Sequence, residues 1–104
     1  MAVFLLPLAI QVSDSALEEY LKAQGLTKEG IIIDQPQRIM VKWGQYAGVP
    51  VIDLLPEFRD WVRQRGDTLF LENDGHWTRG GHRLAATVVA NRLLRDMNLR
   101  IALE

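Results

Sequence analysis

Residues 49–55, VPVIDLL, carry the strongest fold signal in the chain. A short run of valine, isoleucine and leucine between turn-forming residues is typical of a strand that is covered on both faces in a parallel sheet. We therefore predict a buried strand over about residues 49–54. Proline suits the first turn of a helix, so Pro56 indicates that a helix follows immediately, over about residues 56–65.

A second apolar run, AVFLLPLAIQ at residues 2–11, lies near the start of the chain. Proline cannot donate a hydrogen bond within a sheet, so Pro7 limits the predicted strand to about residues 2–6. The run is too short to cross a bilayer, no basic residue precedes it, and no small-residue cleavage site follows. We expect neither a signal peptide nor a transmembrane segment.

Two helices are predicted between these strands. Ser13 is suited to cap a helix that Gly25 ends, and Pro36 begins another that ends near Gly48. Isoleucines in EGIIIDQPQ, residues 29–37, suggest a short strand before the second helix. Four apolar residues fall on one side of that helix, and the spacing of Trp43, like that of Trp61 further on, is typical of core residues. The four are Ile39, Met40, Trp43 and Tyr46.

The last third of the chain predicts an extended segment, a loop and the longest helix. DTLFLEND, residues 67–74, is the extended segment, and Thr78 is suited to cap a helix that reaches about residue 98. An apolar stripe includes Leu84, Ala85, Val88, Val89, Leu93 and Met97. Strands that alternate with helices predict the α/β class, with a small parallel sheet flanked by helices. No repeat or linker is visible, so residues 1–104 form one predicted domain.

Composition excludes several classes of partner. The 104 residues include 48% hydrophobic and 24% charged side chains, as in soluble globular proteins. Twelve basic and 13 acidic residues are mixed along the chain and give a net charge of -1. We therefore expect no binding to nucleic acid or to a membrane surface. Without cysteine there is no disulfide or thiolate nucleophile, and the compartment stays undetermined.

The unusual segment is ENDGHWTRGGH, residues 72–82. One residue separates Asp74 from His76, so both side chains can lie on the same side of an extended loop. An aspartate that accepts a hydrogen bond from one imidazole nitrogen prepares the other nitrogen to take a proton from a hydroxyl. The competing interpretation is an ordinary Asp-Gly turn, with His76 and Trp77 packed against the last helix.

LFLENDGHWTRGGHRLAATVVANRL, residues 69–93, resembles the last conserved block of the SGNH hydrolase superfamily, also called GDSL esterases. VFLLPLAIQV (3–12) and IDQPQRIMVKWGQYAGVPVIDLLPEFRD (33–60) extend the resemblance to the carboxyl-terminal part of members related to carbohydrate O-acetylation. The resemblance implies the corresponding part of a flavodoxin-like fold. It also implies a small acyl ester, such as an O-acetylated carbohydrate, as ligand.

Residue by residue, the resemblance implies that His76 is the general base and Asp74 its orienting partner. Many members have two residues between these positions, but one sub-group has the Asp-x-His-Trp spacing found here. Trp77, beside this pair, is a candidate substrate contact. His82 matches the second histidine of the block, where a structural brace is the favoured interpretation and a second base the alternative.

The nucleophile and the glycine and asparagine blocks of the superfamily have no clear counterpart. Ser13 and Ser15 are the only serines. Ser15 follows a strand and opens a helix, as the family nucleophile does, but helix capping is the simpler interpretation of this serine pair. Without oxyanion donors we expect weak or no activity from the isolated chain. A fragment of a longer hydrolase, an inactive shortened product, and a site completed by another chain are the three explanations.

A sheet edge and apolar helix faces left open by missing segments predict a homo-oligomer, most simply a two-fold dimer. The alternative to a hydrolase or acyltransferase is therefore a non-catalytic oligomeric binding protein. Whether the chain is an enzyme stays undecided.

We predict no cofactor and no metal, since the one candidate ligand set, Asp74, His76 and His82, has no recognisable zinc spacing. Asp53 ends a strand and is interpreted as a cap of the next helix. Leu103 and Glu104 are interpreted as residues that an expression vector left behind.

Overall fold

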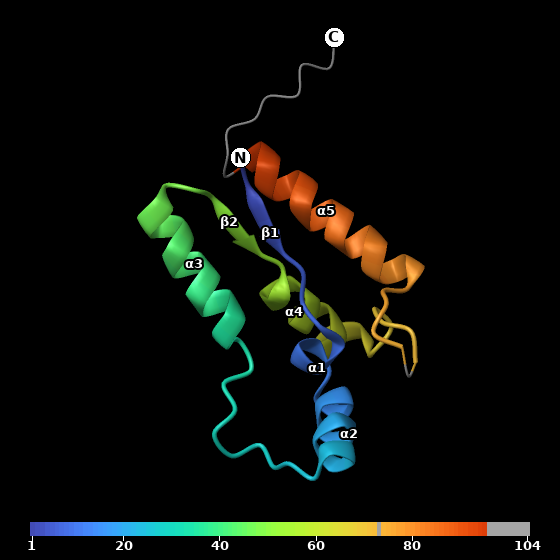
Figure 1. The fold of residues 1–104 in the computed structure, drawn as a ribbon. Helices are drawn as coiled ribbons and strands as arrows, with labels where there is room; N and C mark the ends of the chain where they lie inside the picture. The colour runs from blue at the N-terminus through green and yellow to red at the C-terminus, as the bar shows by residue number, and fades with distance from the viewer. Residues whose placement is uncertain (73, 96–104) are drawn as a thin grey trace.

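The computed structural model describes residues 1–72 and 74–95, and Figure 1 shows their arrangement. Within them, two parallel strands and five helices confirm the predicted α/β class with a small sheet flanked by helices. In chain order the elements are β1 (Val3–Leu5), α1 (Ala9–Val12), α2 (Asp14–Gln24), α3 (Gln35–Ala47), β2 (Val51–Asp53), α4 (Leu55–Arg65) and α5 (Arg79–Arg95). The predictions made for Met97, for the helix end near residue 98, and for Leu103 and Glu104 lie outside the described residues.

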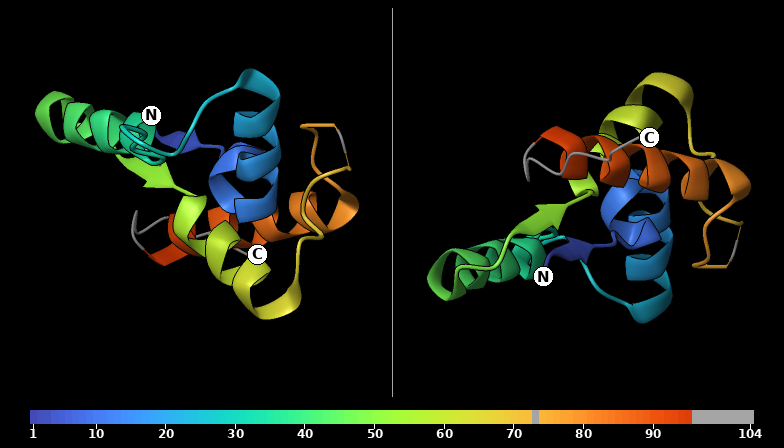
Figure 2. Two further views of the ribbon diagram at one scale, coloured as in Figure 1. Left: turned by 90° about the horizontal axis from the view of Figure 1, so that it is seen from below. Right: turned by 90° about the horizontal axis from the view of Figure 1, so that it is seen from above.

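The sheet separates two groups of helices. β1 and β2 pair in parallel, with Phe4 opposite Ile52. Because side chains alternate along a strand, Phe4 and Ile52 face the main core, whereas Val51 faces α3. Figure 2 shows α2 and α3 on one side of the sheet and α4 and α5 on the other. A Cβ added to Gly44 would lie 2.4 Å from Val51 Cγ2, so glycine permits the close approach of α3.

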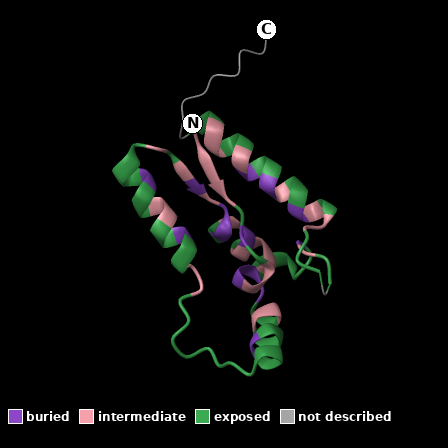
Figure 3. Ribbon diagram, viewed as in Figure 1, coloured by how far each residue is buried: buried purple, intermediate pink, exposed green. Residues whose placement is uncertain are grey.

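The main core lies on the α4 and α5 side. Phe58, Leu54 and Leu69 are its largest fully buried side chains, and Ala85 and Val88 of α5 close it. The ring of Phe58 lies 6.2 Å from that of Phe70 and 5.4 Å from that of Trp77, measured between centroids. Figure 3 shows the buried residues on β2, α4 and the inner face of α5. This core also contacts partly buried Trp61, as its spacing predicted.

Several helix ends follow the sequence signals. Ser13 Oγ accepts a hydrogen bond from the backbone N of Ala16, 3.2 Å away, and confirms the predicted cap of α2. Gly25, with φ of 66°, ends that helix in the left-handed conformation that glycine adopts readily. The N-cap position of α4 is Leu54 rather than the predicted Asp53, but Asp53 Oδ1 accepts a hydrogen bond of 2.9 Å from the backbone N of Leu55, the first residue of that helix.

Three features differ from the sequence predictions. Residues 29–37 form no strand: Ile31 and Ile32 are exposed in the connection to α3. Helix α1 was not predicted, because its residues read as a continuation of an apolar run. Trp43 is 42% exposed and does not pack in the core, since Gly44 and Gln37 occupy the inner face of α3 instead.

A buried amide pair joins α1 to α3. Gln11 Nε2 donates to Gln37 Oε1 at 2.9 Å, and Gln37 Nε2 donates back to Gln11 Oε1 at 3.0 Å. Gln11 also receives a hydrogen bond from Leu8 N and donates to the carbonyl of Ile33. Burial of two amides is tolerated because they are hydrogen-bonded to each other and to the backbone. The carbonyl of Ile33 is thus used by a side chain rather than by a neighbouring strand.

Candidate active site

The Asp-Gly-His segment lies at the tip of a small hairpin between α4 and α5. Phe70 and Trp77 form an isolated antiparallel bridge, and Thr78 N donates to the carbonyl of Leu69 at 2.9 Å. Nearer the tip, Leu71 N donates to the carbonyl of His76 at 2.8 Å. These backbone hydrogen bonds hold residues 74–76 in the loop that precedes the amino-terminal end of α5.

Asp74 holds His76 through two atoms. Asp74 Oδ1 accepts a hydrogen bond from the backbone N of His76 at 3.0 Å and a second from the ring Nδ1. The hydrogen bond from the His76 side chain lowers the pKa of the Asp74 carboxyl, so this group is an ionised acceptor at neutral pH. An ionised carboxylate cannot donate, so Nδ1 must carry the proton of a neutral ring and Nε2 the free lone pair.

The side chains of Asp74 and His76 are both accessible to solvent. The His76 side chain is 85% exposed, and that of Asp74 is 49% exposed. The pair therefore has the orientation of a general base with its partner, in a place that a bulky molecule can approach. Two parts of the competing interpretation hold, because Asp74 forms a turn with the backbone of His76 and Trp77 packs on His82 of α5. The third part does not hold, because the His76 side chain is exposed.

Core residues hold the base of the hairpin. Trp77 packs on Phe58, and its ring meets that of His82 edge to face, 5.3 Å between centroids. His82 thus has the bracing position that was predicted. Thr78 Oγ1 accepts from Gly81 N at 3.1 Å, which confirms it as the cap of α5, and donates to the carbonyl of Thr68 at 2.6 Å. A role of Trp77 in substrate contact stays a prediction.

Ser15 lies in a different setting. Its Oγ is 3.0 Å from Ser13 Oγ, and Ser13, which is almost fully buried, donates to Asp67 Oδ2. Among the hydrogen bonds of the described residues, none joins Ser15 to His76. The hollow beside these serines is lined by Val12, Ser13, Asp14, Ser15, Arg59, Val62, Arg63 and Asp67, without Asp74 or His76.

Sequence reasoning did not identify Asp67 as the partner of Ser13. The two residues are 54 positions apart, and a single aspartate after Gly66 carries no sign of such a contact. The hydrogen bond ties the amino-terminal end of α2 to the segment that leads into the hairpin.

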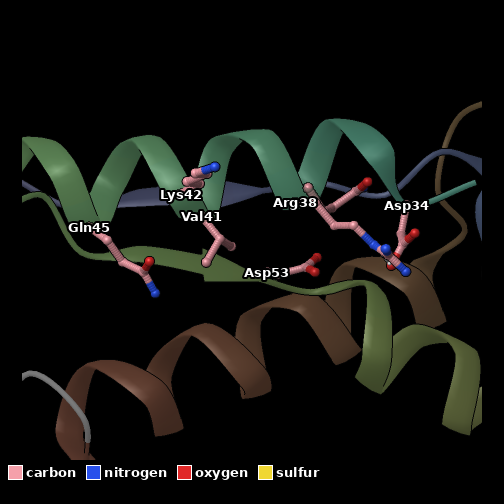
Figure 4. Close-up of a pocket in the computed structure, with 7 residues that line it drawn as sticks. Asp34, Arg38, Val41, Lys42, Gln45 and Asp53 are labelled. Atoms are coloured by element: carbon pink, nitrogen blue, oxygen red, sulfur yellow. Dashed lines mark ion pairs between the residues drawn. The ribbon is translucent and has the colours of Figure 1, made fainter. Parts of the chain in front are cut away.

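A second depression lies between α3 and β2, where Asp53 extends beneath the helix (Figure 4). Arg38 forms a salt bridge of 3.0 Å with Asp34 at its rim. Burial raises the pKa of the Asp53 carboxyl, and the nearby charges of Glu57 and Asp34 act in the same direction. Because Asp53 also accepts a hydrogen bond from the backbone N of Leu55 at the start of α4, its contacts are accounted for by the fold.

In the part of the chain that the structure describes, no three histidine, aspartate or glutamate side chains converge as a metal site would require. His82 in particular stacks on Trp77. None of the helices in residues 1–72 and 74–95 combines the length and the apolar character that crossing a membrane demands.

Comparison with known protein families gives one match. A family model described as SGNH hydrolase-like domain, acetyltransferase AlgX, matches residues 15–102. The matched range contains the strand β2, the hairpin with its Asp-x-His-Trp segment, and α5. Searches of curated proteins and of solved structures returned no match to the chain.

Proposed function

The chain belongs to the family of SGNH hydrolase-like domains described for acetyltransferase AlgX, and from this membership we propose that it takes part in the transfer or hydrolysis of acyl esters. In this proposal His76 is the general base and Asp74 is the residue that orients it. The observation that carries the proposal is the pair of hydrogen bonds from His76 to one carboxylate oxygen of Asp74. The proposed substrate is a small acyl ester, such as the acetyl ester of a carbohydrate.

The chemistry follows from the free Nε2 of His76. As a hydroxyl oxygen attacks the ester carbonyl, Nε2 takes the hydroxyl proton, and the ring becomes positively charged. The carboxylate of Asp74 stabilises that charge through Nδ1. When the carbonyl re-forms, Nε2 returns the proton to the departing alcohol oxygen, so the ring ends as it began.

The remaining question about this site is which residue supplies the attacking hydroxyl. Ser15 is hydrogen-bonded to Ser13, beside a hollow that does not include His76. We therefore propose that the nucleophile and the oxyanion donors come from another polypeptide segment, and that the chain by itself is at most a weak esterase. Ser15 as the nucleophile remains the alternative within this chain.

A non-catalytic binding protein is the second candidate. The observation in its favour is the exposed apolar side of α3, where Trp43 and Tyr46 are 42% and 92% exposed. Such a surface fits a protein that binds a partner.

The test is hydrolysis of a short-chain activated ester by the purified chain. Free imidazole also hydrolyses such esters, so Asp74→Asn is the informative variant: it keeps the imidazole and removes only the charged partner. We expect both Asp74→Asn and His76→Ala to lower the rate by about tenfold or more. Glu72→Gln, a change at another exposed hairpin position, is the matched control and should leave the rate unchanged.

Ser15→Ala separates the two sources of the nucleophile. An unchanged rate supports a hydroxyl from outside the Ser15 hollow, whereas a loss equal to that of His76→Ala assigns the role to Ser15. If the rate of the unaltered chain does not exceed that of Asp74→Asn or His76→Ala, the Asp74 and His76 pair gives no esterase activity in the isolated chain, and the non-catalytic binding function is favoured.

A further inference from the structure

The side of the sheet opposite the main core carries a large exposed apolar surface. It consists of α2, residues 25–34 and α3, which Figure 2 shows together on one side of the sheet. Seven of the twelve large apolar side chains that the described residues expose lie on it: Tyr20, Leu26, Ile31, Ile32, Ile39, Trp43 and Tyr46. Single exposed apolar residues are common, but so many within 27 consecutive positions indicate an interaction surface.

Helix α3 is packed on one side and exposes apolar residues on another. Its inner side, with the buried residues Gln37 and Gly44, packs against β2 and Gln11. Ile39, Trp43 and Tyr46 follow at spacings of four and three residues, so they form one stripe, and their exposed fractions are 57%, 42% and 92%. An exposed apolar stripe of this length on a helix is expected to be covered by another surface.

The charges on this surface are divided between its two helices. Residues 35–47 of α3 contain Arg38 and Lys42 and no acidic residue. Helix α2 exposes Asp14, Glu18 and Glu19 and one basic residue, Lys22, so its net charge is negative. In residues 1–72 and 74–95 neither Lys42 nor Glu19 has a salt-bridge partner, although Glu18 pairs with Lys28 and Arg38 with Asp34. Each helix therefore offers the charge that the other would attract.

We propose that this surface binds a second copy of the chain about a two-fold axis, with α3 of each copy against α2 of the other. A two-fold interface uses the same surface on both copies, so it must contain both members of every complementary pair. Here α2 and α3 lie on the same side of the sheet, so one axis can bring both α2–α3 contacts together. The apolar stripe of α3 lies at the centre and Lys42 faces Glu19 at the edge.

A second copy explains the surface better than an unrelated partner does, because the complementary acidic and basic helices occur on the same face of one chain. The proposal does not depend on the acyl-transfer function: the Asp74 and His76 hairpin lies between α4 and α5, outside this surface. Loss of the dimer and loss of esterase activity are therefore separate outcomes.

Light scattering coupled to gel filtration tests the dimer with the intact chain. At micromolar concentration we expect twice the chain mass of 11.8 kDa. Tyr46→Lys should weaken the dimer by about tenfold or more, and because Tyr46 is 92% exposed the change leaves the fold intact. Leu94→Lys places the same charge at an exposed apolar residue of α5 and is the matched control, with no expected effect.

Charge reversal tests the reciprocal contact. Lys42→Glu and Glu19→Lys should each weaken the dimer by about tenfold, since each places like charges in contact, and the two changes together should restore it. A monomeric unaltered chain at these concentrations would overturn the proposal. A dimer that Tyr46→Lys leaves unchanged would refute this surface, and a double variant no tighter than the single ones would refute the packing of α3 against α2.

Discussion

The two sides of the small sheet use similar side chains in opposite ways. On the α4 and α5 side, Phe58 and Leu69 are completely buried and Trp77 packs on Phe58. The hairpin that carries Asp74 and His76 is therefore anchored to the core. On the α2 and α3 side, aromatic and aliphatic residues of comparable size face outward. Regular spacing of apolar residues therefore predicts that a helix face packs against another surface, but it does not say whether that surface belongs to the same chain.

The positions of glycine and glutamine explain this division. Gly44 and Gln37 take the inner side of α3, where the helix approaches β2 and Gln11. The larger residues of the helix are thereby displaced to its outer side. In α5, by contrast, Gly81 permits contact with Leu69, and Ala85 and Val88 of the same helix are buried in the core.

The largest expected effect is at the centre of the core. Phe58→Ala should lower the free energy of unfolding by about 3–5 kcal/mol, because it leaves a cavity beside Phe70 and Trp77. Tyr46→Ala should change it by less than about 0.5 kcal/mol in the monomer. Urea unfolding of both variants, at a protein concentration at which the chain is monomeric, checks the contrast. Equal losses would show that the outer side of α3 is packed within one chain.

A smaller effect is expected where α5 meets the hairpin. A Cβ at Gly81 would lie 2.3 Å from the carbonyl oxygen of Leu69, so Gly81→Ala should destabilise the fold by about 1–3 kcal/mol. Its neighbour Gly80 has no contact closer than 3.6 Å, and Gly80→Ala should be neutral or stabilise by less than about 1 kcal/mol. Thermal unfolding of the pair decides the matter, and a destabilising Gly80→Ala would contradict the difference between these positions.

Loss of a cap should matter less. Thr78→Ala removes the acceptor for Gly81 N and should cost about 1 kcal/mol. Thr78→Ser keeps that acceptor and also the hydroxyl that donates to the carbonyl of Thr68. Urea unfolding should therefore place Thr78→Ser close to the unaltered chain, and a loss equal to that of alanine would show that the methyl group matters instead.

The smallest effect concerns pH on the α3 side. Burial raises the pKa of Asp53, so the folded chain binds a proton there more tightly than the unfolded chain does. The ionised carboxylate consequently opposes folding at neutral pH, and this penalty fades as the pH falls through the folded pKa toward about 4. Asp53→Asn keeps an oxygen for Leu55 N, so its melting temperature should exceed that of the unaltered chain at pH 7. A margin that does not shrink on acidification would contradict this account.

Local signals in the sequence predicted much of the fold. Ser13, Gly25 and Thr78 act within a few residues of their own positions, and their predicted roles as caps and a helix end are confirmed. The isoleucines of residues 29–37 led to the wrong prediction of a strand. A strand needs a neighbouring strand for its backbone hydrogen bonds, and in the described residues the sheet consists of β1 and β2. Trp43 was misplaced for a similar reason, since spacing defines a stripe without saying which side of a helix faces the sheet.

The site was predictable only in part. Asp74 and His76 are two positions apart, so their contact is local and the sequence pattern indicates it. The contact of Trp77 with Phe58 and that of Ser13 with Asp67 join distant segments, and no single sequence pattern encodes them.

The central claim is that Asp74 fixes His76 with a proton on Nδ1 and a free lone pair on Nε2. Nitrogen NMR of the His76 ring, in the unaltered chain and in Asp74→Asn, measures this directly. For the neutral ring we expect the Nδ1-protonated tautomer in the unaltered chain, and a shift toward the Nε2-protonated form in Asp74→Asn. An Nε2-protonated ring in the unaltered chain, or identical spectra for the two proteins, would contradict the account of His76 as an oriented base.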